Sequence, residues 1–131
     1  MSEVRQELLQ GMTKTEWFEK IKQASEAVGT YNESFDEIID TLAEILETRD
    51  KALEQFRQSG ANPVVTHTNK AKQVNFAKNP LLVIAMDLNT QALAYWRDLG
   101  LTPAGLKKLN ADGLSAKATA GFEQLLEKIG Q

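Results

Sequence analysis

The stretch from Lys78 to Pro103 constrains the fold of this chain more than any other part, because it reads as one long helix with marked ends. Asn79-Pro80 joins a favoured N-cap residue to the residue best preorganised for the first helical position. Gly100 is the usual left-handed residue that ends a helix. Thr102-Pro103 then repeats the start signal for another helix. We therefore expect one uninterrupted helix over residues 80–99.

Two adjacent apolar stripes run along this expected helix, and together they exceed the arc of about 100° that an ordinary surface helix buries. The first stripe comprises Leu81, Ile84, Ala85, Leu88, Ala92, Tyr95 and Leu99. The second comprises Leu82, Met86 and Leu93, with Trp96 leaning toward the first. Such a helix needs cover on two sides, from its own chain or from a neighbouring subunit. We therefore place in the core or at a subunit contact Leu82, Met86, Leu88, Leu93 and Trp96.

Residues that favour helix starts and helix ends recur in the rest of the chain, and they predict a mainly α fold. A capping box at Thr13 and Glu16 starts a helix that ends at Gly29. A similar pair, Ser34 and Glu37, predicts the start of the longest helix, which continues through residue 59. Apolar residues at helical spacing also predict shorter helices over residues 2–10, 103–109 and 115–129.

Arg49 is the one charged residue on the apolar face of the longest expected helix, between Leu46 and Leu53. Its aliphatic stem can lie along the apolar surface while the guanidinium reaches water. An ion pair with another helix or another subunit is the alternative. Arg49 is therefore a further candidate for the core or for a subunit contact.

Between the two long helices, the segment over about residues 64–77 has the composition of a short β-hairpin. Val64 to Thr68 and Val74 to Ala77 are rich in strand-forming residues, and a polar turn lies at 69–72. An irregular loop is the alternative interpretation. Because an isolated hairpin is marginally stable, we expect it to pack on the helices or to pair with another subunit.

Length and composition indicate one helical domain of 131 residues, with 42% hydrophobic and 25% charged residues. We divide it into N-terminal helices (1–29), a central part (30–109) and a C-terminal helix (110–131) that is expected to be mobile in its first half. The sequence contains no cysteine, no membrane-length apolar run and no signal-peptide core, so we expect an intracellular protein.

Candidate catalytic or cofactor-binding constellations are missing from the sequence. His67 is the only histidine, so a histidine cluster for a metal is excluded. Neither a phosphate-binding G-x-x-x-x-G-K-[ST] loop nor a G-x-S-x-G nucleophile elbow is present. The acids at the start of the longest helix are explained by the helix dipole. We expect no enzyme activity, no cofactor and no metal.

Charge is distributed unevenly along the chain, whose net charge is −3. Residues 1–62 hold 7 Lys and Arg against 13 Asp and Glu, whereas residues 63–131 hold 8 against 5. No acid occurs between Pro63 and Met86, so the lysines there form a positive island that can attract phosphates. The same lysines are also consistent with an ordinary solubilising surface. The DNA-contact candidates are Lys70, Lys72, Lys78, Lys107 and Lys108.

The succession of motifs resembles the P27 family of phage terminase small subunits over roughly residues 28–109. It comprises Thr30-Tyr31-Asn32, the long helix, the segment Val64 to Lys70, Asn79-Pro80 and the run Leu99-Gly100-Leu101-Thr102-Pro103 with Gly105-Leu106-Lys107. The resemblance implies a homo-oligomeric ring that binds phage DNA and recruits and regulates a large subunit carrying the ATPase and the nuclease. It also implies a location in the cytoplasm of an infected or lysogenic bacterium.

Two other classes of protein compete with this interpretation. A helical protein-interaction module or structural oligomer without a nucleic-acid role fits the wide apolar surface equally well. A hydrolase that uses paired acids is weaker, because those acids have a structural explanation. Salt-sensitive DNA binding separates the terminase interpretation from the protein-interaction module, whereas oligomerisation alone does not.

Overall fold

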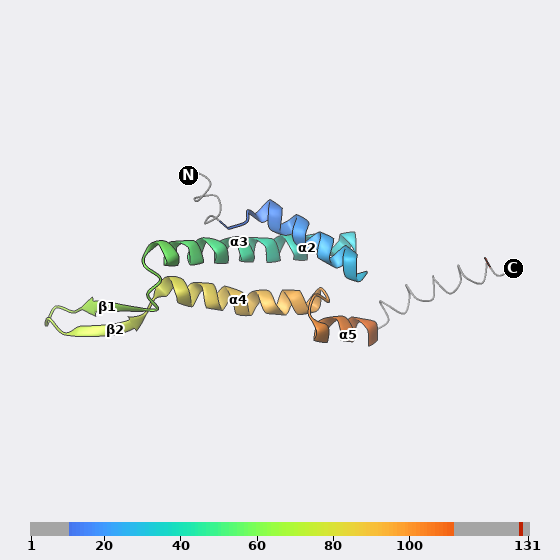
Figure 1. Cartoon of the computed structure of the whole chain (residues 1–131). Helices are drawn as coiled ribbons and strands as arrows, with labels where there is room; N and C mark the ends of the chain where they lie inside the picture. Colours follow the sequence, from blue (N-terminus) through green and yellow to red (C-terminus); the bar gives the residue numbers. More distant parts are fainter. Residues whose placement is uncertain (1–10, 112–128, 130–131) are drawn as a thin grey trace.

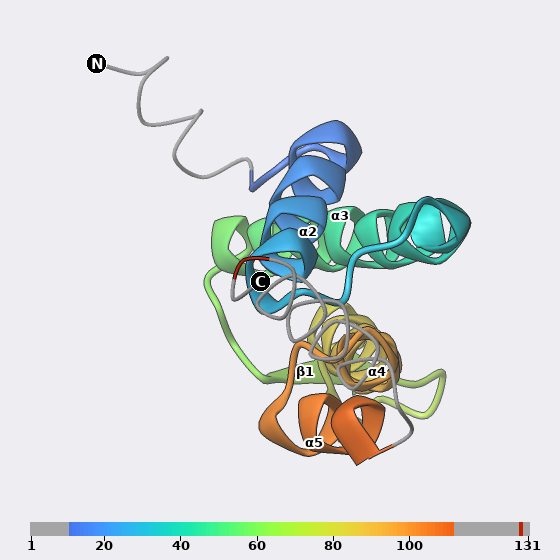
Figure 2. The same ribbon diagram turned by 90° about the vertical axis from the view of Figure 1, so that its right-hand side faces the viewer.

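A computed structural model describes residues 11–111 and residue 129 of the chain. Three long helices, stacked in order, form its body (Figures 1 and 2): α2 (Lys14–Val28), α3 (Asp36–Gln58) and α4 (Pro80–Asp98). Helix α3 lies in the middle and packs against both of the others. The expected mainly α fold is thereby confirmed. The helices predicted over 2–10 and 115–129 lie outside the described residues, apart from Ile129.

The core lies where α3 meets its two neighbours. Ile21 of α2 and Ile39, Leu42 and Leu46 of α3 are fully or almost fully buried, and each contributes roughly 1.5–3 kcal/mol by leaving water. Small side chains, such as Ala92 on α4, allow the helices to approach closely. No helix in the described part of the chain is long and apolar enough to cross a membrane.

Helix α4 begins and ends where the sequence predicts. Asn79 caps it, because its side-chain oxygen accepts a hydrogen bond from Leu81 N at 3.0 Å, and Gly100 follows it with a left-handed φ of 74°. The first apolar stripe packs on α3 through Ala85 and Ala92, which are buried. Most of this stripe therefore faces the core as predicted, but Ile84 is 46% exposed.

The second stripe of α4 stays largely uncovered by the chain itself. Met86 is 58% exposed and Leu93 is 48% exposed. The other predicted residues of this helix, Leu82 and Trp96 and, from the first stripe, Leu88, are half-buried. Of the five predicted residues on this helix, Trp96 packs against the core, Leu82 and Leu88 are half-buried, and Met86 and Leu93 are exposed.

The starts of α2 and α3 differ from each other and partly from the prediction. Thr13 caps α2 by accepting from Glu16 N at 3.2 Å, but the Glu16 carboxylate accepts from the Thr13 hydroxyl instead of from its amide. At α3 the predicted capping box of Ser34 and Glu37 is wrong. A 3-10 turn, η1 (Glu33–Phe35), precedes the helix, and Asn32 caps this turn by accepting from both N and Oγ of Ser34.

The predicted hairpin is confirmed and projects beyond the ends of α3 and α4 (Figure 1). Strands β1 (Val64–Thr68) and β2 (Val74–Lys78) pair antiparallel, with Thr66 opposite Phe76. At its base, Asn79 N donates to Pro63 O at 2.8 Å and Asn79 Nδ2 donates to Asn62 O at 3.0 Å. One asparagine therefore joins the hairpin to the start of α4.

The other end of α4 is joined to the short helix α5 (Pro103–Ala111). Thr102 caps α5, as predicted, by accepting from Gly105 N at 3.0 Å. The Thr30 hydroxyl donates to the carbonyl of Leu99 at 2.9 Å, and this buried bond ties the connection between α2 and α3 to the end of α4. The backbones of α4 and α5 touch at Gly105, where an added Cβ would lie 2.0 Å from Arg97 O.

Candidate nucleic-acid interface

The three lysines of the acid-free segment all lie on the hairpin and are all exposed. Lys70 and Lys72 belong to the turn that joins the strands, and Lys78 ends β2 beside the helices. No acid lies on the hairpin to neutralise their field. The hairpin is therefore the described element whose charge best suits phosphate contact.

The side chain of Asn69 holds the turn that carries Lys70 and Lys72. Its oxygen accepts from Ala71 N at 3.0 Å and from Gln73 N at 2.9 Å, while its carbonyl accepts from Lys72 N at 3.0 Å. The turn therefore presents its lysines from a fixed backbone, which lowers the entropy lost on binding.

Lys72 adopts a left-handed conformation with φ of 61°. Glycine and asparagine take this conformation readily, whereas lysine does so at a cost. A strained residue at an exposed tip is a reason to look for a function of its side chain. The ammonium group of Lys72 is the part that a phosphate would recognise.

The other two candidates are not part of this group. Lys107 and Lys108 are exposed on α5, which lies at the opposite end of α4 from the hairpin (Figure 1). The 19 residues of α4 separate the two groups by about 28 Å. The five lysines that the sequence suggested therefore form two positive surfaces.

The hairpin also has an exposed apolar surface that the sequence-based prediction did not include. The register places on one face Val64, Thr66, Thr68, Val74, Phe76 and Lys78. We call this the ribbon face. Phe76 is 76% exposed and Val74 is 57% exposed, whereas Val65 and Ala77 on the opposite face are half-buried. The alternation of residues along β2 was the signal that could have revealed it.

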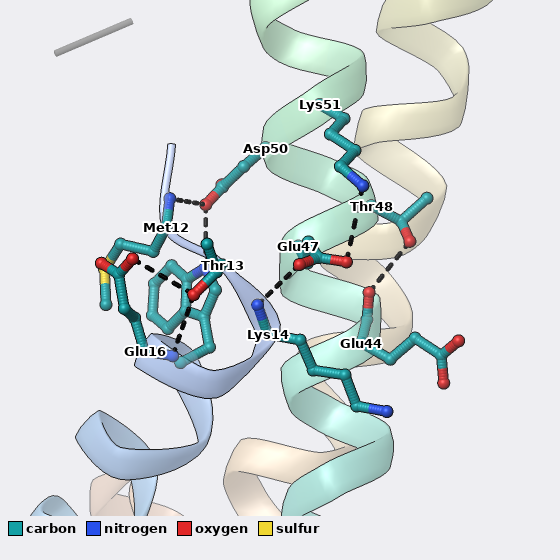
Figure 3. A network of polar contacts seen from close by, with 10 residues as sticks. Met12, Thr13, Lys14, Glu16, Glu44, Glu47, Thr48, Asp50 and Lys51 are labelled. Carbon is teal, nitrogen blue, oxygen red and sulfur yellow. Dashed lines mark hydrogen bonds and ion pairs between the residues drawn. The ribbon is translucent and has the colours of Figure 1, made fainter. Parts of the chain in front are cut away.

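Charged groups in the N-terminal half are engaged in contacts between α2 and α3 (Figure 3). Lys14 N donates to Glu47 Oε2 at 2.6 Å, and Lys51 Nζ lies 3.6 Å from the other oxygen of that carboxylate. The pKa of Lys14 is raised because its ammonium hydrogen-bonds to Asp40 at 3.2 Å. These contacts give Lys14, Asp40, Glu47 and Lys51 a structural role.

Lys20 and Lys22 of α2 each lie over an aromatic ring. Lys20 Nζ is 5.1 Å from the ring centre of Trp17, and Lys22 Nζ is 5.3 Å from that of Tyr31. Cation–π contacts of this length are worth about 0.5–1 kcal/mol at exposed sites. Helix α2 is therefore a weaker candidate for DNA contact than the hairpin.

Arg49 links all three long helices. Its guanidinium pairs with Asp50 of the same helix at 3.0 Å, donates to Asn89 of α4 at 3.1 Å and lies 5.5 Å from the Trp17 ring. Trp17 Nε1 in turn donates to Asp50 at 2.8 Å. The ion pair is within α3, and the link to α4 is a hydrogen bond to a neutral group. Arg49 therefore belongs to the helix packing.

The described residues contain no group of three or more His, Cys, Asp or Glu side chains arranged to hold a metal ion. What the described surface offers is a basic hairpin with a hydrogen-bonded turn at one end and exposed apolar side chains along α4. Both are features of a protein that binds macromolecules.

Residues 13–115 match the sequence profile of a family described as phage terminase, small subunit. Because the match covers most of the chain, the protein belongs to this family, and its role lies in the packaging of phage DNA. The resemblance seen in the sequence is confirmed at this level, although the match does not distinguish the P27 family. No curated protein and no solved structure matches the chain.

Proposed function

We propose that this protein binds phage DNA through the lysines of its hairpin, as an oligomeric ring, and recruits and regulates the large terminase subunit. The observation that carries the DNA contact is the acid-free hairpin, which extends from the helices and holds Lys70 and Lys72 on a fixed turn. The protein would act in the cytoplasm of an infected or lysogenic bacterium.

The uncovered stripe of α4 supports the assembly. Met86 and Leu93 are exposed on one helix face, two turns apart, with half-buried Leu82 one turn before Met86. Burying apolar side chains of this size between subunits contributes about 1.5–3 kcal/mol each. In a cyclic assembly this stripe meets a different surface of the next subunit. The ring then presents one hairpin per subunit to the duplex.

A salt titration tests the DNA contact. Lys70→Gln with Lys72→Asn removes both charges, and asparagine tolerates the left-handed backbone at the second position. Each lost phosphate contact flattens the slope of log affinity against log salt by about 0.9, so we expect a decrease near 1.8 with little change in sequence preference. Fluorescence anisotropy with labelled duplexes at several salt concentrations measures this.

The matched control replaces Lys20 and Lys22, which lie on α2, by glutamine. We expect this variant to keep the wild-type slope. If only the α2 variant binds more weakly, the contact lies on α2 and the hairpin is excluded. If the wild-type protein assembles but binds no duplex, the alternative of a structural oligomer without a nucleic-acid role is correct.

A further inference from the structure

The ribbon face presents apolar and small polar side chains beside the lysines of the turn. Phe76 and Val74 are largely exposed, and Thr66 and Thr68 lie directly opposite them on β1. A two-stranded hairpin that is not packed on a core is marginally stable. The exposed apolar side chains of this face therefore need a partner that also accepts positive charge.

Charge decides which partner fits the ribbon face. The hairpin carries Lys70, Lys72 and Lys78 and no acid, so two copies of it placed face to face would bring like charges together. A nucleic acid supplies phosphates for the lysines at the turn. It also supplies apolar groups, because the C5-methyl of thymine lies in the major groove. In protein–DNA complexes this methyl is contacted by phenylalanine and by the methyl group of threonine.

The dimensions of the hairpin fit one groove of DNA. Two paired strands lie about 4.8 Å apart, and their side chains add to that width. The major groove is about 12 Å wide, admits a two-stranded ribbon and presents the thymine methyl groups, whereas the minor groove is about 6 Å wide and does not present them. The hairpin extends away from the helices, so they do not obstruct its entry (Figure 1).

We infer that the hairpin is a major-groove arm whose ribbon face lies on the base edges, with Phe76 and Val74 against thymine methyl groups and Lys70 and Lys72 on the flanking phosphates. This inference rests on the proposed DNA contact of the hairpin and adds the groove and the chemical group that is recognised. The hydroxyls of Thr66 and Thr68 face the same base edges and can hydrogen-bond there.

Replacing thymidine by deoxyuridine tests the inference, because it removes the methyl group and leaves the pairing unchanged. The probes are a duplex of A·T pairs and the same duplex with deoxyuridine at every thymidine. The wild-type protein should bind the methylated duplex about fourfold more tightly for each methyl group buried. Phe76→Ala should lose most of this preference, and Val74→Ala should lose a smaller part. Circular dichroism shows whether each variant is folded.

Two controls separate this inference from the phosphate contact. Lys70→Gln with Lys72→Asn should lower the affinity for both duplexes and keep their ratio. Ile84→Ala removes an exposed apolar side chain of α4 and should change neither the affinity nor the ratio.

Three outcomes would overturn the inference in distinguishable ways. If the wild-type protein binds both duplexes equally, with the salt dependence expected above, the groove contact is wrong and the phosphate contact stands. If Phe76→Ala lowers the assembly mass measured by light scattering, a second copy of the chain covers the ribbon face. If no duplex binds at all, the proposed function fails together with the inference.

Discussion

The two ends of α4 are held in opposite ways. At its C-terminal end, Gly100, Gly105 and Thr30 are buried, and α5 packs so closely that an added Cβ on Gly105 would meet the backbone of Arg97. At its N-terminal end, Asn79 makes the joint, and the hairpin beyond it exposes most of its side chains. One end is closed by packing, and the other is left accessible.

This difference shows that the motifs on which the sequence resemblance rests serve largely as joints. Thr30 and Leu99, from two separate motifs, meet in one buried hydrogen bond, and Asn79 caps α4 while it closes the base of the hairpin. The residues that suit a partner lie between these joints. These motifs therefore indicate how the elements are joined, whereas the proposed contacts with partners rest on the exposed residues.

The largest effect is expected at the closed end. Gly105→Ala places a Cβ where Arg97 O now lies, so α5 must move away from α4. We expect the free energy of unfolding to fall by about 3 kcal/mol, as for overpacked sites. Urea unfolding at a fixed protein concentration measures it. The reverse change at the exposed neighbour, Ala104→Gly, should cost at most about 1 kcal/mol. Equal losses would contradict a closed joint.

A smaller effect is expected at the accessible end. Asn79→Ala removes the cap on Leu81 N and the bond to Asn62 O, which should lower the free energy of unfolding by about 1–2 kcal/mol. The control is Asn110→Ala, an exposed site on α5, where we expect less than about 0.5 kcal/mol. A cost at Asn79 as small as that of the control would show that the hairpin joint contributes nothing.

The smallest expected effect is a pH dependence of the free energy of unfolding that arises from Tyr31, next to Thr30 at the closed end. The Tyr31 hydroxyl donates to Asp36 at 2.8 Å, and this hydrogen bond raises the pKa of Tyr31 to about 12 from its usual 10.0. Because the unfolded chain loses this proton first, the contribution to stability is present below pH 10 and is lost between about 10 and 12. Urea unfolding across this range should show the decline.

The matched variant Tyr31→Phe lacks the titrating hydroxyl, so this part of the decline should disappear from its profile. Ultraviolet absorbance of the tyrosinate gives an independent measure of the raised pKa. An identical alkaline decline in the wild type and in the variant would exclude Tyr31 as its origin.

The sequence predicts elements well where the local signal is strong. The start of α4 at Asn79-Pro80, its end near Gly100 and the start of α5 after Thr102 are all in place, because caps and stop residues act within a single turn. The hairpin could also be predicted from its strand-forming residues. The start of α3 was predicted wrongly, since Asn32 provides an alternative partner for Ser34 two residues earlier.

Surface properties depend on tertiary geometry and were harder to predict. Whether Met86 or Leu88 faces solvent depends on the rotation of α4 against α3, which periodicity restricts only to a broad face. Composition alone puts the five candidate lysines into one group, whereas the length of α4 places Lys107 far from Lys70. Two of the three partners of Arg49, Trp17 and Asn89, come from distant parts of the sequence, so the sequence alone left its role open.

The bond between Thr30 and Leu99 has a consequence for the order of folding. It joins residues 69 positions apart, so it forms only after the chain has closed a long loop. The contacts of α3 with α2 and with α4 span shorter stretches of the chain and are expected to form earlier. The closed end of α4 is then ordered last. A nascent chain would therefore display its hairpin before Thr30 is tied to the end of α4.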